Sequence, residues 1–253
     1  SNESVTLVLS DPAMKKEFAF VLGDFNNWQV EDDSYMKRTP DGAFHWITID
    51  GLVPGKEYAY QYYIDGELKL ADAYGEKILD PWNDKWIPEE TYPNLMDYPA
   101  GLTTGIVSVF QTAQEDYNWQ VENFVPTAVN ETQSNLIIYE LLIRDFVGDS
   151  RIKSVMDSLD YLKNLGITAI ELMPINEFEG NDSWGYNPSF YFAPDKAYGT
   201  KNDYKAFIDA CHERGIAVIL DVVLNHSFGQ SPMVQMYWDG AQNIPTSDNP
   251  WYN

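Results

Sequence analysis

Two apolar runs, "ITAIELMPI" (167–175) and "IAVILDVVL" (216–224), most constrain how this chain can fold. Each is preceded by a helical pattern with one apolar face, over 150–166 and 200–215. A further strand pattern, "NLIIYELLI" (135–143), comes before the first helix. Strands joined by helical crossovers form a parallel sheet, and such apolar strands are typically buried on both faces. We therefore predict an α/β segment in this half of the chain.

The second predicted helix has clear start and stop signals. Thr200 is the expected N-cap, Asp203 lies three residues on in a capping-box position, and Gly215 follows the last turn. Gly166 ends the first helix in the same way. Cys211 lies on the apolar face of the second helix and is the only cysteine, which predicts a buried thiol and excludes an internal disulfide.

The first half of the chain has a different pattern, in which short β-prone runs alternate with glycine turns. The predicted strands are "VTLVLS", "EFAFVLG", "FHWITID" and "EYAYQYYID". Strands in succession without a helix predict an all-β immunoglobulin-like sandwich over residues 1–110. Residues 111–134 have no sustained period and are predicted to be a connector that lies against both halves, which leaves 135–253 for the α/β segment.

The composition excludes several classes of protein. The net charge is −23, with 39 acidic against 16 basic residues, and such a surface repels nucleic acid. No apolar run approaches the ~18 residues of a membrane span. No glycine-rich phosphate loop follows a strand, so a nucleotide-binding domain is set aside. The compartment stays open: low cysteine content fits the cytoplasm, and a secreted, periplasmic or cell-surface location is favoured for an acidic polymer-degrading enzyme.

Polar and aromatic residues gather after the predicted strands. In parallel β/α sheets the chemistry lies at the carboxyl ends of the strands. The third run delivers Asp221, Asn225 and His226, and the aromatic loop after the second contains Trp184 and Tyr186. Flat rings suit the apolar faces of sugars, and acids and amides suit their hydroxyls, although packing of the loop is the alternative role for any one ring.

Two further carboxylates, Glu140 and Glu171, lie inside predicted strands. They could serve as acid/base groups. We prefer to interpret them as buried structural carboxylates paired with neighbouring residues.

These motifs carry a resemblance. "YELLIRDF", "TAIELMPI", "WGYNPSFYFAPDKAYGT" and "DVVLNH" resemble, in this order, segments of the α-amylase family of glycoside hydrolases, over about 136–238. "VLGDFNNW" and "YQYYIDGE" resemble the early-set or glycogen-binding-type sandwich that precedes the barrel in some members. The resemblance implies an incomplete (β/α)8 TIM barrel, of which this chain holds the first three strands. It also implies part of a retaining glycoside hydrolase that acts on α-glucans such as starch, glycogen or pullulan-like polysaccharides.

The resemblance also assigns roles to residues. Tyr186 would stack on the sugar next to the scissile bond, His226 would hydrogen-bond the same sugar, and Asp221 would be a polar group beneath it. Trp184 joins this substrate-binding set. Asn225 would ligate a structural calcium, which only some members have, and no other cofactor is implied.

The nucleophile and the acid of the family's mechanism have no counterpart in this sequence and are expected beyond Asn253. We therefore expect the parent protein to be an enzyme and this chain to be inactive by itself. Three strands leave an open barrel edge, so a second copy or a complementary fragment is the expected partner. The alternatives are a glucan-branching transferase and a non-catalytic glucan-binding or scaffold protein.

The sandwich itself is predicted to be structural. Glycogen-binding relatives use a tryptophan like Trp28, but Gln61 and Leu68 stand where those relatives have a lysine and a second tryptophan. With two of the three sugar contacts replaced, support of the barrel is the favoured role.

Overall fold

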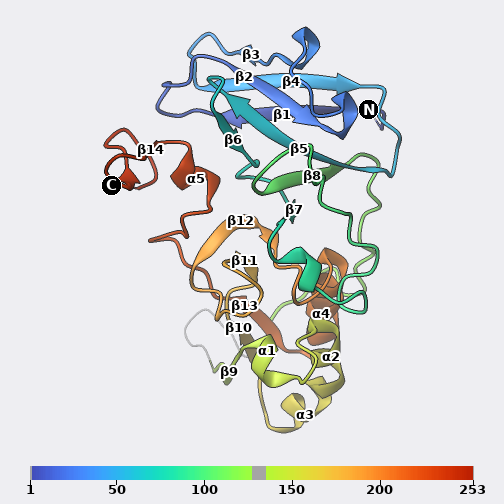
Figure 1. Cartoon of the computed structure of the whole chain (residues 1–253). Coiled ribbons are helices and arrows are strands. Elements are labelled where there is room, and N and C mark those ends of the chain that lie inside the picture. Colours follow the sequence, from blue (N-terminus) through green and yellow to red (C-terminus); the bar gives the residue numbers. More distant parts are fainter. Residues whose placement is uncertain (1, 127–134, 253) are drawn as a thin grey trace.

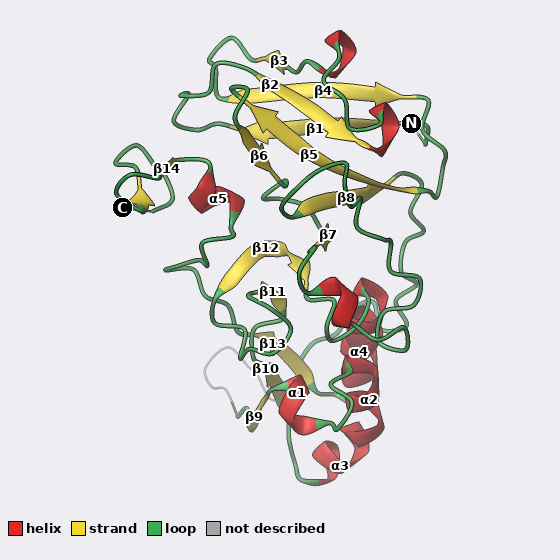
Figure 2. Cartoon of the chain, in the orientation of Figure 1, coloured by secondary structure: helices red, strands yellow, loops and turns green. Residues whose placement is uncertain are grey.

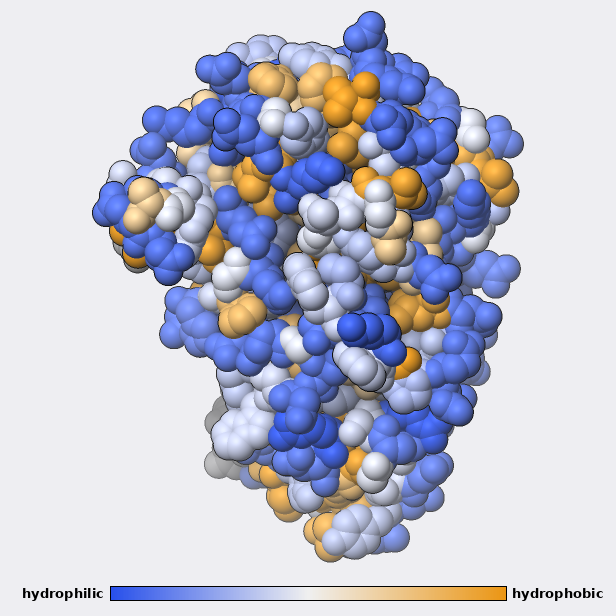
Figure 3. All heavy atoms as spheres, in the orientation of Figure 1, coloured by the Kyte–Doolittle hydropathy of each residue, from blue (hydrophilic) through white to orange (hydrophobic). Residues whose placement is uncertain are grey.

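The computed structural model describes residues 2–126 and 135–252. Figure 1 shows a β-rich N-terminal half above an α/β half, with β11 (Asn176–Phe178) and β12 (Pro188–Pro194) between them. Hydrophilic residues cover most of the face seen in Figure 3, and hydrophobic ones are scattered among them. No helix in the described part of the chain is long and apolar enough to cross a membrane.

The N-terminal β unit (residues 2–111) consists of two antiparallel sheets. The first has the strand order β1 (Ser4–Ser10), β4 (Phe44–Asp50), β3 (Lys37–Arg38). The second has the order β2 (Ala19–Gly23), β5 (Glu57–Ile64), β8 (Val107–Gln111), β7 (Ile78–Leu79), and β6 (Leu68–Leu70) pairs with β5. Short 3-10 helices lie in the connections: η1 (Asp24–Asn26), η2 (Asp32–Ser34) and η3 (Asp84–Trp86).

The two sheets bury a shared core because their side chains alternate between two faces. In β1, Leu7 and Leu9 are buried, whereas Val8 between them is exposed. Ile47 of β4 and Tyr62 of β5 belong to the same core. The four predicted strands are confirmed as β1, β2, β4 and β5, and β3, β6, β7 and β8 are additional strands that the sequence pattern did not predict.

The α/β unit (residues 135–224) contains the predicted parallel sheet. Its order is β13 (Ala217–Leu220), β10 (Ala169–Leu172), β9 (Ile138–Leu141), and both pairings are parallel. The helices are α1 (Ile143–Phe146), α2 (Ile152–Val155), α3 (Leu159–Asn164) and α4 (Lys201–Glu213). The single helix predicted over 150–166 is divided by the 3-10 turn η4 (Met156–Ser158), although its apolar residues face the core as predicted.

The prediction that these strands are buried on both faces holds for the central strand β10, where the successive residues Ala169 and Ile170 are both buried, and is wrong for the edge strands β9 and β13. Figure 2 shows α2, α3 and α4 gathered on one side of the sheet. On the edge strands, Ile138 is 47% exposed and Leu220 is 48% exposed. β13 also ends at Leu220, so the rest of the predicted run 216–224 continues without strand structure, and Leu224 is 79% exposed. Within the described residues the sheet is thus open at both edges, as expected.

Two segments connect the halves. Of the predicted connector 111–134, residues 127–134 lie outside the described residues, and the remainder contacts both units. The backbone N–H groups of Gln120 and Val121 donate to Asp209 of α4, and the carbonyl of Thr112 accepts from Gly55 of the β unit.

The C-terminal segment (residues 228–252) returns to the β unit, which the sequence did not predict. It contains α5 (Pro232–Gln235), β14 (Trp238–Asp239) and β15 (Ile244–Pro245). Tyr237 is part of the core of the β unit, and its hydroxyl donates to Asp11.

Candidate functional site

The candidate site (Tyr186, Asp221 and His226) lies at the carboxyl ends of the parallel strands. Asp221 follows β13 directly, and its N–H donates to the carbonyl of Leu172 at the end of β10, over 3.0 Å. Tyr186 comes from the loop between β11 and β12. The sheet topology therefore gathers residues that are far apart in the sequence at the edge where such sheets bind ligands.

The Tyr186 hydroxyl donates to Asp221 Oδ2 over 2.7 Å. This hydrogen bond is the largest cause that raises the pKa of the Tyr186 hydroxyl to about 12, followed by burial and the charge of Asp221. The hydroxyl therefore stays protonated at neutral pH and fixes the ring against the end of β13.

His226 is bound from both sides. Its Nε2 lies 2.7 Å from the carbonyl oxygen of Tyr186, and its Nδ1 lies 3.1 Å from Asn225 Oδ1. A carbonyl oxygen can only accept, so Nε2 donates its hydrogen to Tyr186. A sugar hydroxyl that binds this ring must therefore replace one of its protein partners.

Gly185 explains how the loop reaches the sheet. Its φ is +88°, and a Cβ placed there would lie 2.4 Å from the carbonyl oxygen of Pro174, just beyond β10. No larger residue fits this close approach or adopts this conformation without strain. The "WGY" sequence thus places Tyr186 over the end of the sheet because of its glycine.

Further side chains, which the sequence pattern did not identify, hold the loop that carries Tyr186 and the segment that carries His226. Glu179 Oε1 accepts hydrogen bonds from Ser183 Oγ and Asn187 Nδ2, both at 2.9 Å, and so braces the loop that carries Tyr186. The Tyr191 hydroxyl donates to the carbonyl of His226 over 2.8 Å. The only signal for these residues was the density of aromatic and polar residues in the loop.

Trp184 and Asn225 are less integrated than the other predicted residues. Trp184 is 61% exposed, and within the described residues no hydrogen bond or ring contact joins it to Tyr186, Asp221 or His226. Asn225 is exposed and lies against His226. Among the residues that the structure describes, no group of three or more His, Cys, Asp or Glu side chains is arranged to hold a metal, and the calcium role of Asn225 stays a prediction.

The interpretation of Glu140 and Glu171 as buried, paired carboxylates is wrong. The two residues are opposite each other in the register of β9 and β10, on the face away from the helices. Glu140 is exposed and Glu171 is half-buried, and the charges of both carboxylates help to raise the pKa of the Tyr186 hydroxyl. The open edge of β9 leaves Glu140 in solvent.

The carboxylate–lysine cluster (Asp84, Glu177, Asp195 and Lys196) is a largely buried group of charges that no sequence pattern predicted. Lys196 Nζ contacts Glu177 and lies 3.3 Å from Asp84 Oδ1, with the Lys196 side chain only 3% exposed. Burial, the larger effect, raises the pKa of Glu177 to about 8 and that of Asp195 to about 7, although Lys196 lowers both. The cluster ties β11 and the end of β12 to the β unit.

Two of the positions compared with glycogen-binding relatives are buried. Trp28 is 5% exposed, and its indole Nε1 donates to Asp24 Oδ1 over 3.0 Å. Gln61 is fully buried and donates to the carbonyls of Thr104 and Ile106. Neither residue presents a group to a sugar in solution.

A parallel β/α sheet with polar groups at the carboxyl ends of its strands defines a large class of α/β proteins that bind ligands there. Within that class the family is specific, because residues 108–253 match the model of the alpha amylase catalytic domain. The chain belongs to the alpha-amylase family.

Two curated relatives extend the comparison. The chain is 31% identical over 192 residues to a malto-oligosyltrehalose trehalohydrolase of Saccharolobus solfataricus, across 76% of this chain and 29% of that protein. It is 32% identical over 236 residues to a 1,4-alpha-glucan branching enzyme of Rhodospirillum rubrum, across 90% of this chain and 29% of that protein. The chain thus spans 29% of the length of each of these relatives.

Solved structures support the same fold. The Group B Streptococcus pullulanase SAP, solved with maltotetraose, has a TM-score of 0.66 and 22% identity across 89% of this chain and 32% of that chain. A Salmonella typhimurium structure described as an alpha amylase has a TM-score of 0.65 and 24% identity across 100% of this chain and 37% of that chain.

Proposed function

We propose that this chain is part of a retaining glycoside hydrolase that acts on α-glucans, and that it supplies sugar-binding groups of the active site. The observation that carries the proposal is the Tyr186–Asp221–His226 arrangement at the carboxyl ends of the strands, in a chain of the alpha-amylase family. The pullulanase solved with maltotetraose supports an α-glucan as the ligand.

Each residue then has a defined task. The half-buried Tyr186 ring offers a face to a pyranose while Asp221 holds its hydroxyl. His226 exchanges one of its protein partners for a sugar hydroxyl. Trp184, exposed in the same loop, extends the contact to a neighbouring sugar unit.

We propose further that the catalytic carboxylates are not among these residues and that this chain alone is inactive. Retaining cleavage uses two carboxyl groups about 5 Å apart, one as nucleophile and one as acid. Asp221 accepts from Tyr186, which suits a positioning role better than that of nucleophile. A further copy or a complementary segment would cover the open edges of the sheet, and the N-terminal β unit would be an immunoglobulin-like support.

The test is hydrolysis of starch and pullulan, measured as released reducing ends, by this chain and by one extended through a whole barrel. Activity in the extended chain only is expected. Activity in this chain would refute the assignment of the carboxylates, and activity in neither would favour a non-catalytic glucan-binding protein.

A branching transferase is the second candidate, because a branching enzyme is among the relatives at 32% identity. The products distinguish the two reactions. A hydrolase releases reducing ends in proportion to the bonds cleaved, whereas a transferase forms new α-1,6 branches with no net release.

A further inference from the structure

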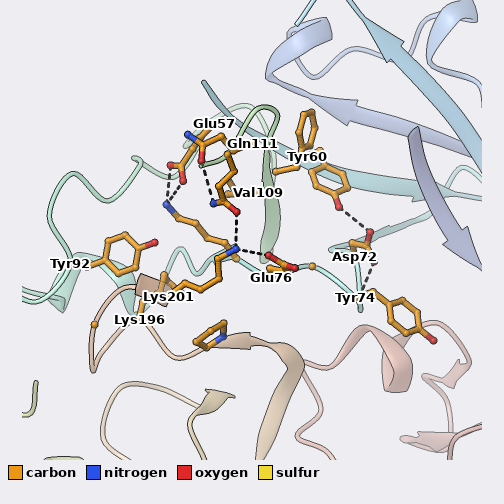
Figure 4. Close-up of a pocket in the computed structure, with 16 residues that line it drawn as sticks. Glu57, Tyr60, Asp72, Tyr74, Glu76, Tyr92, Val109, Gln111, Lys196 and Lys201 are labelled. Atoms are coloured by element: carbon orange, nitrogen blue, oxygen red, sulfur yellow. Dashed lines mark hydrogen bonds and ion pairs between the residues drawn. The ribbon is translucent and has the colours of Figure 1, made fainter. Parts of the chain in front are cut away.

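A cleft with a volume of about 270 Å³ lies where the N-terminal β unit meets the α/β unit (Figure 4). Its walls come from β5, the segment 72–77, β8 and the start of α4, and none of its residues belongs to the candidate site. Ligand pockets usually have volumes of about 300–1,000 Å³, so this interunit cleft suits a small molecule or a short piece of a longer one.

Two lysines of the interunit cleft are already paired with carboxylates, and Asp72, a further lining residue, accepts hydrogen bonds from the Tyr60 and Tyr62 hydroxyls. Lys77 Nζ pairs with Glu57, with nitrogen–oxygen distances of 2.8 and 2.9 Å. Lys201 Nζ lies 2.6 Å from Glu76 Oε2 and 2.8 Å from Gln114 Oε1. An anionic ligand would have to displace a carboxylate from its lysine. An uncharged ligand with several hydroxyls can instead add hydrogen bonds to the free lone pairs of these carboxylates and amides.

Aromatic rings accompany these polar groups. Tyr74 lines the cleft and contacts Phe192 of β12, with ring centroids 5.2 Å apart and planes inclined by 31°. The two rings come from different units, and Tyr74 is 48% and Phe192 52% exposed. Figure 4 places Tyr74 and Tyr92 at opposite sides of the cavity, with the ion pairs between them.

We propose that the interunit cleft is a second sugar-binding site, which takes one or two pyranose units of a neutral oligosaccharide. The apolar face of one unit stacks on Tyr74, whose ring Phe192 supports, and its hydroxyls bind Glu76 and Lys201. The uncharged, hydroxyl-rich character of the ligand follows from the cleft itself. Its identity as an α-1,4-glucan rests on the proposed function. Because both units form the walls, the bound sugar stabilises their relative arrangement.

The test is a titration of the 253-residue chain with maltoheptaose, followed by amide chemical shifts. The amide signal of Gly75 reports binding in the cleft, and that of Gly185 reports binding at the candidate site. The two signals therefore give a separate Kd for each site. Tyr74→Ala should weaken binding at Gly75 about fivefold to tenfold, the worth of one aromatic contact, and leave the Kd at Gly185 unchanged. Tyr161→Ala, at a 60% exposed tyrosine of α3, is the matched control and should change neither.

The two sites can fail separately. The cleft is not a sugar site if the amide signal of Gly75 does not shift while that of Gly185 does. The same conclusion follows if Tyr74→Ala and Tyr161→Ala give the same Kd at Gly75. In both cases the proposed function stands. If only Gly75 shifts, the cleft proposal stands and the proposed function fails. Should Tyr74→Ala not fold, Glu76→Gln replaces it, because that side chain is 68% exposed, and it should weaken binding at Gly75 severalfold.

Discussion

Replacing Lys196 by methionine should destabilise the folded chain by about 3–5 kcal/mol at pH 8, the usual cost of removing one partner of a buried ion pair. The side chains of Lys196 and Glu177 are 3% and 9% exposed, so water cannot replace the lost ammonium group. A loss of this size is a large part of the 5–15 kcal/mol that stabilises a typical domain.

The pH dependence of this loss has a definite sign. Burial raises the pKa of Glu177 to about 8 and that of Asp195 to about 7, above the values of about 4 in an unfolded chain. The folded state therefore binds more protons, and the stability that these groups contribute below about pH 4 is lost as the pH rises to about 8. Without Lys196 nothing offsets the desolvation of the ionised carboxylates. The cost of Lys196→Met should therefore fall to about 1–3 kcal/mol at pH 5, where the carboxyls are protonated.

Urea unfolding at pH 5 and pH 8, followed by tryptophan fluorescence, measures both values. Lys163→Met is the matched control, because Lys163 is exposed on α3 and its replacement should cost less than about 0.5 kcal/mol. An equal free energy of unfolding for the two variants at pH 8, or a larger cost of Lys196→Met at pH 5, would refute this reasoning.

Three further predictions concern α4. Cys211 is fully buried, and burial raises the pKa of its thiol to about 12. A thiol reagent should therefore label Cys211 only after urea is added. Rapid labelling of the native chain would contradict the buried placement of this residue. Thr200→Ala removes the N-cap side chain, which accepts a hydrogen bond from the Asp203 N–H over 3.1 Å. Thermal unfolding should show that the free energy of unfolding falls by about 1 kcal/mol. An unchanged Tm would show that this cap does not stabilise α4. Asp209→Ala leaves the backbone N–H groups of Gln120 and Val121 without their acceptor. Limited proteolysis of this variant should therefore cleave first near Gln120 and Val121. A digestion pattern like that of the wild type would show that Asp209 does not hold this segment in place.

The elements that local pattern determines were predictable. Thr200 and Asp203 form the predicted capping box of α4, and its apolar face packs on the sheet. Alternation in "VTLVLS" and "FHWITID" likewise predicted β1 and β4. In these segments the side chains that specify the element also form its core.

What the sequence did not predict depends on contacts between distant residues. The hairpin β11–β12 reads as an aromatic loop, because its register is irregular and its strands are short. Lys196 and Asp84 are far apart in the sequence, so no spacing rule brings them together. For the candidate site, the motif predicted Tyr186, Asp221 and His226, but not the glycine contact at Pro174 that positions Tyr186.

The most direct test of the central claim, that Tyr186, Asp221 and His226 form a glucan-binding site, is a nuclear magnetic resonance titration of the histidine rings. The chain has three histidines, and the other two are built-in controls: His45 is 1% exposed, and His212 stacks on Phe124. Adding maltoheptaose should shift the ring signals of His226 in a saturable way and leave those of His45 and His212 in place. A His226 ring that does not respond at saturating glucan would contradict the account.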